Sequence, residues 1–268
     1  MSESESIRVN LLQYVQLRID PRYLSSGLIT LILVIGQFYV GFLHDLSQLC
    51  TAISVALLVE LVLGRLLTGR WLNPVSAYIT GISCAILLRS LYLWPFVIAS
   101  SLSIMSKYIL RFKGRHLWNP SNLGICIVLF TAPGFVAPLG EQWGNDLWAM
   151  AVIWVLGGVT LWRVQRFHVS FTYAISFVIL AYLRSLMTGI PFLAEVAPIT
   201  GPMYQLMAFF MVTDPATSVS SRGGRIAVAF LVALAEMVFR FFEIVNAPLY
   251  ALFIVGPVAK LVDLKRLT

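Results

Sequence analysis

Three charged residues lie inside long apolar stretches: Glu60, Glu236 and Arg240. An ionised group at the centre of a membrane helix costs about 2.5–3.5 kcal/mol on insertion scales, so each of these residues needs a partner or a function. Glu236 and Arg240 have i, i+4 spacing on one helical face, which predicts an ion pair between them. Arg65 lies off the helical face of Glu60, so we expect the partner of Glu60 on another helix. The alternative for all three residues is a place in an ion or proton path.

Asparagine or aspartate stands shortly before proline at the edges of several apolar runs. The segments read LNPVSA at 72–77, WNPSNLG at 118–124, TDPATS at 213–218 and NAPLYA at 246–251. Proline lacks a backbone donor and disfavours helix in the preceding residue, so a helix begins late, ends early or breaks at these places. Two interpretations stay open. The pairs either cap helices at the membrane interface or line a binding site between broken helices.

A compact basic cluster precedes the second of these prolines and consists of Arg111, Lys113, Arg115 and His116. Such a cluster before a helix suits an anionic group, for example a flavin phosphate or an acidic lipid. The accumulation of basic residues in cytoplasmic loops produces the same pattern. Lys107 is expected either to extend towards the cytoplasmic edge of the membrane or to lie beside a binding pocket.

The composition excludes an ordinary soluble domain. Hydrophobic residues make up 59% of the 268 residues and charged residues 12%, against about 45–50% and about 25% in soluble domains. The net charge of +7 is typical of basic cytoplasmic loops, so the expected partner is the lipid bilayer and not nucleic acid. The Cys and His residues lack the spacing of a metal site, a disulfide framework or a haem, so no metal and no haem are expected. The GxSxG and HExxH motifs of hydrolases are missing from the sequence, so no hydrolase site of these kinds is expected.

Apolar runs between charges and turn residues predict about ten membrane spans. They are placed at 25–43, 49–67, 74–88, 92–110, 121–139, 147–162, 169–187, 198–213, 225–241 and 247–263. With the N-terminus in the cytoplasm, all but three of the 19 Lys and Arg residues fall on the cytoplasmic side. The exceptions, Arg89, Arg184 and Arg240, are placed with Glu195 on the outer side. Both termini are therefore expected in the cytoplasm.

The proline-containing segments divide equally between two halves of five spans each. After five membrane crossings, an odd number, the chain is on the opposite side of the membrane. The second half therefore starts from that side and is inverted relative to the first. We expect an all-α integral membrane protein built from two inverted five-helix repeats, 25–139 and 140–268, after a cytoplasmic segment 1–24. Broken helices in paired positions of such repeats commonly line the binding site.

Two segments carry a family resemblance: SKYILRFKGRHLWNPSNLGICIVLF at 106–130 and MAFFMVTDPATSVSSRGG at 207–224. They resemble signatures of the RnfD/NqrB family of membrane proteins, which includes components of the Rnf electron-transport complex and of the sodium-pumping NADH:quinone reductase. The N-terminal segment IDPRYLSSGLITLIL and the sequence WNPSN resemble segments of the shorter UnbU-like members from enediyne biosynthesis clusters. The resemblance implies a multi-pass protein of the bacterial inner membrane with partner membrane or redox subunits.

The larger family members carry FMN joined to a threonine in the outer region between spans 5 and 6. Here residues 132–159 contain neither Ser nor Thr, so covalent FMN is not expected at that place. Thr217 is not expected to replace the missing threonine, because its segment resembles a different family signature and is placed in the cytoplasm. A non-covalent flavin (FMN or riboflavin) or a quinone, a partner that carries the redox centre, and a different function on the same fold stay open.

The resemblance and the proline segments together predict one central site between the halves, and Trp118 is a candidate for stacking on its ring. The residues expected to bind the cofactor are Lys107, Tyr108, Arg115, His116, Trp118, Asn119, Asn122, Thr213, Asp214 and Thr217, with Glu60, Glu236 and Arg240 in an ion path. The expected function is that of a membrane subunit in flavin- or quinone-linked electron transfer. The alternatives are a transporter of a small anionic or amphiphilic compound and a scaffold of a biosynthetic membrane complex.

Overall fold

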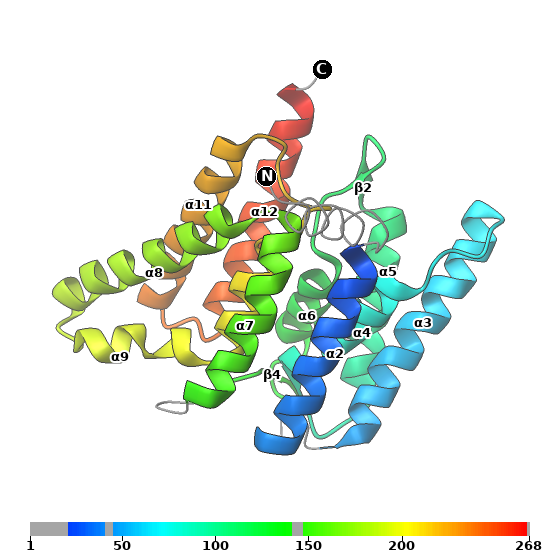
Figure 1. Cartoon of the computed structure of the whole chain (residues 1–268), viewed down its shortest axis with the longest axis horizontal. Helices are drawn as coiled ribbons and strands as arrows, with labels where there is room; N and C mark the ends of the chain where they lie inside the picture. Colours follow the sequence, from blue (N-terminus) through cyan, green and yellow to red (C-terminus); the bar gives the residue numbers. More distant parts are fainter. Residues whose placement is uncertain (1–20, 41–44, 141–146, 267–268) are drawn as a thin grey trace, which may run out of the picture.

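The computed structural model describes residues 21–40, 45–140 and 147–266, and this part of the chain is mainly helical (Figure 1). The predictions for the N-terminal segment up to residue 20 and for 141–146, within the loop of the missing flavin threonine, lie outside the described residues. The all-α prediction is confirmed in its coarse form.

Among the described residues, the first half contributes five helices, each of which packs against at least one of the others. Helix α3 packs against α4 and α5, α5 packs against α6, and α2 packs against α4. The bounds are α2 Pro21–Val40, α3 Leu46–Thr68, α4 Val75–Leu87, α5 Trp94–Ile109 and α6 Pro120–Thr131. Two of them start at Asn-Pro segments: Asn119 caps α6, and Asn73 accepts a hydrogen bond from the amide of Val75 at the start of α4.

The second half contains one interrupted segment in its middle. The bounds are α7 Leu147–Val164, α8 Phe167–Thr188, α9 Phe192–Val196, η1 Ala197–Thr200, α10 Pro202–Leu206, η2 Met207–Met211, α11 Arg222–Phe241 and α12 Ala247–Arg266. Helix α8 packs against α11, and α11 packs against α12. Element η2 is a π-helical turn that continues α10 directly, and the amide of Val212 donates to the carbonyl of Met207. The halves meet where α2 contacts α7 and where α6 contacts α12.

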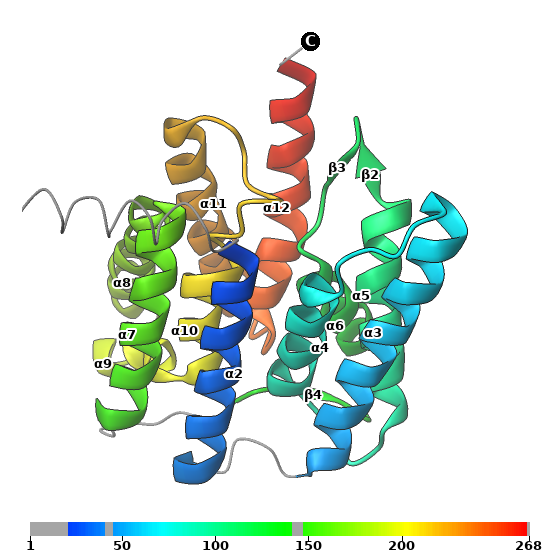
Figure 2. The ribbon, with the colours of Figure 1, turned by 45° about the vertical axis from the view of Figure 1, so that its right-hand side comes forward.

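Two short antiparallel strand pairs lie at opposite ends of the helices (Figure 2). Strands β2 (Arg111–Phe112) and β3 (Arg115–His116) form a hairpin, and Lys113 and Gly114 at its tip both have positive φ, as a tight two-residue hairpin turn requires. Strand β1 (Leu88–Arg89) pairs with β4 (Ala137–Pro138). We call the end with the β2–β3 hairpin and the last turn of α12 the basic end, and the end with β4 and α9 the β4 end.

Three described helices are long and apolar enough to cross a membrane, namely α3, α8 and α12, and several shorter helices are also apolar. Large apolar side chains repeat every four residues on the exposed faces of α3 (Leu58, Val62, Leu66) and α8 (Phe171, Ile175, Ile179). Exposed apolar surface of this kind fits contact with lipid. The structure is therefore compatible with a membrane protein.

The predicted span 121–139 is too long, because α6 ends at Thr131. The sequence Ala132-Pro133-Gly134 follows, and proline cannot continue the helical hydrogen bonds. The apolar residues beyond it form a turn and β4. Helix α6, with 12 residues, is therefore about 18 Å long, shorter than a hydrocarbon core of about 30 Å.

Candidate functional site

Two of the predicted site residues meet although they are far apart in the sequence. The side-chain amide of Asn119, before α6, donates to Oδ2 of Asp214, after η2, at 3.3 Å. Each residue also fixes its own turn, since Oδ1 of Asn119 accepts from the amide of Asn122 and Oδ1 of Asp214 accepts from the amide of Ala216. Thr217 adds a hydroxyl hydrogen bond to Asp214. The contact thus joins a turn of the first half to a turn of the second half.

Side chains on either side of Asn119 bond to the backbone of α12. The indole N–H of Trp118 donates to the carbonyl of Phe253 at 2.9 Å, and the side-chain amide of Asn122 donates to the carbonyl of Leu249 at 3.0 Å. Pro257 lies four residues after Phe253 and has no N–H, so this carbonyl lacks its usual helical donor. Trp118 therefore replaces a hydrogen bond that the proline removes.

Positive charge surrounds the carboxylate of Asp214. Arg166 and Lys260 act on it electrostatically, and the almost fully buried Lys260 donates to the carbonyl of Ser218 in the same turn. Burial raises the pKa of Asp214, and the hydrogen bonds from Ala216, Thr217 and Asn119 partly oppose this rise. Thr213 donates to the carbonyl of Phe209 at 2.6 Å, back in the π-helical turn. The sequence placed Lys260, like most Lys and Arg residues, on the cytoplasmic side, although its position within the apolar run 247–263 indicated burial.

Lys107 does not extend towards the edge of the membrane, so that alternative is wrong. Its ammonium group is buried, 2.9 Å from Oε2 of Glu60 and 2.8 Å from the hydroxyl of Ser76. The prediction that Glu60 finds its partner on another helix is confirmed, because Glu60 lies on α3, Lys107 on α5 and Ser76 on α4. Tyr108 lies beside Glu60. These groups form a polar centre inside the first half.

The basic cluster before α6 forms the β2–β3 hairpin, with Arg111 and Arg115 exposed and His116 half-buried. Lys113 donates from its ammonium group to the carbonyl of Leu264 at 3.0 Å. A cation is favourable there, because the carbonyls of the last helical turn are unpaired and the helix end is negative. At least one member of the cluster thus holds the end of α12.

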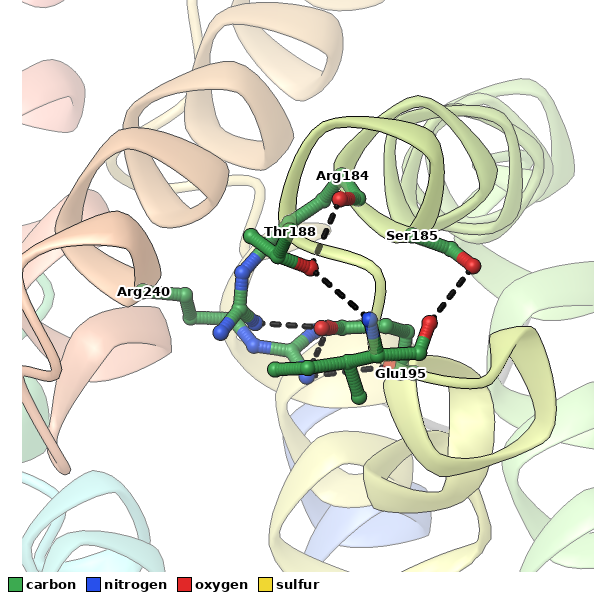
Figure 3. A network of polar contacts seen from close by, with 6 residues as sticks. Arg184, Ser185, Thr188, Glu195 and Arg240 are labelled. Carbon is green, nitrogen blue, oxygen red and sulfur yellow. Dashed lines mark hydrogen bonds and ion pairs between the residues drawn. The ribbon is translucent and has the colours of Figure 1, made fainter.

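The predicted ion pair between Glu236 and Arg240 is wrong. Arg240 turns to Glu195 of α9, where its Nη2 lies 3.3 Å from Oε2 and donates to the backbone carbonyl at 3.0 Å. Arg184 of α8 pairs with the same carboxylate at 2.6 Å (Figure 3). Oε2 of Glu236 instead accepts a hydrogen bond from the hydroxyl of Tyr173 at 2.7 Å. Helical spacing allows the predicted pair, but the nearly fully buried Glu195 attracts both guanidinium groups.

The last turn of α8 holds Arg184 in place (Figure 3). Thr188 donates to the carbonyl of Arg184 at 2.9 Å and accepts from the amide of Ile190, while Ser185 donates to the carbonyl of Ile190 at 2.7 Å. Gly189 has φ +75°, the left-handed conformation that ends many helices.

A cavity of about 410 Å³ opens beside this network, and Pro138 of β4 is among its lining residues. Its polar groups include Arg184, Arg240 and Tyr204, and apolar side chains such as Leu139, Met203 and Ile244 form much of its wall. Of this site, the sequence indicated only Arg240, as part of an ion path; Arg184 and Glu195 were placed in outer loops. The one available signal was the position of Glu195 within the apolar segment FLAEVAP.

No model of a known protein family matches the chain, and no curated protein is similar to it. The resemblance of the two segments to the RnfD/NqrB family therefore stays a prediction.

Of the predicted cofactor residues at the two turns, Thr217 lines a small cavity. Asn119 and Asp214 bond to each other, and the cavity beside Thr217 and Ser218 measures only about 30 Å³, enough for one or two water molecules. Sites for drug-sized ligands measure about 300–1,000 Å³, and the cavity of about 410 Å³ lies in that range. Within the described ranges, no group of three His, Cys, Asp or Glu residues is placed to hold a metal ion.

Proposed function

We propose that the chain is an integral membrane protein of ten membrane segments in two inverted five-helix halves. The packing supports this arrangement, because α3 contacts α5 as α8 contacts α11, and α5 contacts α6 as α11 contacts α12. Corresponding helices also begin alike: Pro74 and Pro202 stand at the starts of α4 and α10, and Pro120 and Pro248 in the first turns of α6 and α12. The basic end faces the cytoplasm of a bacterial cell in this proposal, as expected from the positions of Arg and Lys.

The proposed function is that of a membrane subunit in an electron-transfer system, with a flavin or quinone bound non-covalently. The observation that carries the proposal is the cavity of about 410 Å³ with Arg184 and Arg240 in its wall. It is large enough for one ring system, has apolar walls, and places two cations where a carbonyl edge of the ring would lie. The ring would supply the redox chemistry when bound, and the chain would hold it and stabilise its negative charge.

The spectrum of the purified protein tests this proposal. We expect a flavin spectrum, or a quinone in an organic extract, and we expect acid precipitation to release the ligand because no covalent bond holds it. Arg240→Gln is expected to lower the bound ligand about tenfold, since a charged hydrogen bond contributes about 1.5–3 kcal/mol.

Two control variants locate the site. Asp214→Asn changes the turns and Arg70→Gln changes an exposed arginine, and both are expected to keep the ligand. If Asp214→Asn lost the ligand and Arg240→Gln kept it, the binding site would lie at the two turns of Asn119 and Asp214 and not in the cavity. A protein without bound flavin or quinone would contradict the redox proposal.

A transporter of a small anionic compound is the second candidate, favoured by the two arginines in an open cavity. Flux of an organic anion into liposomes, with no bound pigment, would support it over the redox function.

A further inference from the structure

The two arginines of the cavity wall and the buried acidic residues behind it carry more positive than negative charge unless Glu236 is ionised. Arg184 and Arg240 share the one carboxylate of Glu195, and the side-chain exposures are 13%, 15% and 2%. Each guanidinium also lies against an aromatic ring, Arg240 over Phe177 and Arg184 over Phe241. Glu243 lines the cavity as well, but it is exposed, so water screens its charge. The three buried ionic groups therefore have a net charge of +1.

Glu236 lies one helical turn before Arg240 and is 1% exposed. Tyr173 of α8 donates to its Oε2, whereas its buried Oε1 has no hydrogen-bond partner among the described residues. The titratable and charged groups that act on it are Tyr173, Tyr204 of α10 and Arg240 of α11 itself, and none of them comes from α12. A free buried carboxylate oxygen is costly when ionised and less costly as a neutral acid. Oε1 is thus the oxygen atom on which the carboxyl group would carry a proton.

Tyr204 connects Glu236 with the cavity. It lines the cavity and also lies next to the carboxyl group of Glu236. A charge that enters the cavity therefore lies close to this carboxyl group. Because Glu236 is buried, water screens its charge less than that of an exposed group, so its protonation and the charge in the cavity influence each other.

We propose that the cavity binds a monovalent organic anion together with one proton, the anion on Arg184 and Arg240 and the proton on Oε1 of Glu236. With Glu236 ionised, the buried groups are neutral and an added anion has no counter-charge. With Glu236 protonated, the net charge is +1 and the anion restores neutrality. The anion and the proton consequently increase the affinity for each other by the same factor.

The ligand class follows from the cavity wall. Two guanidinium groups match a carboxylate, which they bind through paired hydrogen bonds, and the apolar wall accommodates a hydrophobic body. The inference concerns the cavity of the proposed function but needs no redox chemistry. A colourless protein that binds anions would contradict the redox proposal and leave this inference intact.

Calorimetric titration of the purified protein with benzoate tests the inference. In two buffers of different ionisation enthalpy, we expect the uptake of up to one proton per benzoate bound. We expect the Kd to rise about tenfold per pH unit over the range in which Glu236 loses its proton. Glu236→Gln is expected to bind benzoate with an affinity independent of pH, because the amide is neutral like the protonated acid.

Matched variants distinguish benzoate binding at this site from nonspecific binding elsewhere on the protein. Arg184→Gln and Arg240→Gln are expected to weaken benzoate at least tenfold, and Arg70→Gln, at an exposed position, is expected to leave the Kd unchanged. Neutral benzamide is expected to bind without proton uptake. Benzoate binding to the wild-type protein without proton uptake across the whole pH range, an unchanged pH slope in Glu236→Gln, or no benzoate binding at any pH would overturn the inference.

Discussion

Replacing Lys107 by methionine is expected to lower the free energy of unfolding by about 3–5 kcal/mol, because it leaves the carboxylate of Glu60 buried without its cation. The pair is 2.9 Å long with both side chains almost inaccessible. The hydroxyl of Ser76 also contacts the ammonium group, and it cannot replace a full charge beside Glu60. Unfolding in detergent, followed by tryptophan fluorescence, measures the effect.

Two variants show whether the charge or the side-chain volume is responsible. The double variant Lys107→Met with Glu60→Leu removes both charges and is expected to recover most of the lost stability, since an apolar pair can replace a buried ion pair. Lys265→Met changes a lysine that is exposed on α12 and is expected to cost less than about 1 kcal/mol. Equal losses in Lys107→Met and Lys265→Met would contradict the buried pair.

Replacing Gly124 by alanine is expected to cost about 3 kcal/mol, because α5 and α6 approach each other closely at this residue. A Cβ atom there would lie 2.1 Å from the carbonyl oxygen of Ala99 and 2.2 Å from the hydroxyl oxygen of Ser103. The nearer contact is backbone, so relief requires the helices to separate. The shift in melting temperature of the detergent-solubilised protein measures the effect.

Gly158 is the matched control for this prediction. It lies inside α7, and an added Cβ would meet nothing within 4 Å. Gly158→Ala is therefore expected to leave the stability unchanged or to raise it by up to about 1 kcal/mol, the difference in helix propensity. A Gly124→Ala protein as stable as Gly158→Ala would show that the helices are further apart than described.

The sequence predicts helices well where charges or turn residues bound the apolar runs. The span at 147–162 corresponds to α7, Leu147–Val164, because Asp146 precedes this run and Arg163 and Arg166 mark its end. The predicted span 121–139 is wrong after Thr131, because hydropathy does not distinguish a helix from an apolar turn and strand. The pairing of β1 with β4 depends on contacts between segments far apart in the chain, and no local pattern contains it.

The candidate site is predictable only in part. Recurring Asn-Pro and Asp-Pro segments pointed to Asn119 and Asp214, and these two residues are in contact. The partner of Arg240 could not be predicted, because helical spacing identifies residues on one face but not the rotamer, which Glu195 of another element decides. The cavity itself arises only when the ends of several elements come together.

The π-helical turn Met207–Met211 sets the orientation of the residues after it. Such a turn corresponds to an α-helix with one inserted residue, and each residue rotates the chain by about 100°. Loss of a single residue here would shift the phase of Thr213 and Asp214 relative to α10 and turn the carboxylate away from Asn119. The contact between the two halves therefore depends on the number of residues in 207–211. We expect an insertion or deletion there to break it, whereas a substitution that conserves side-chain volume keeps the phase of the helix.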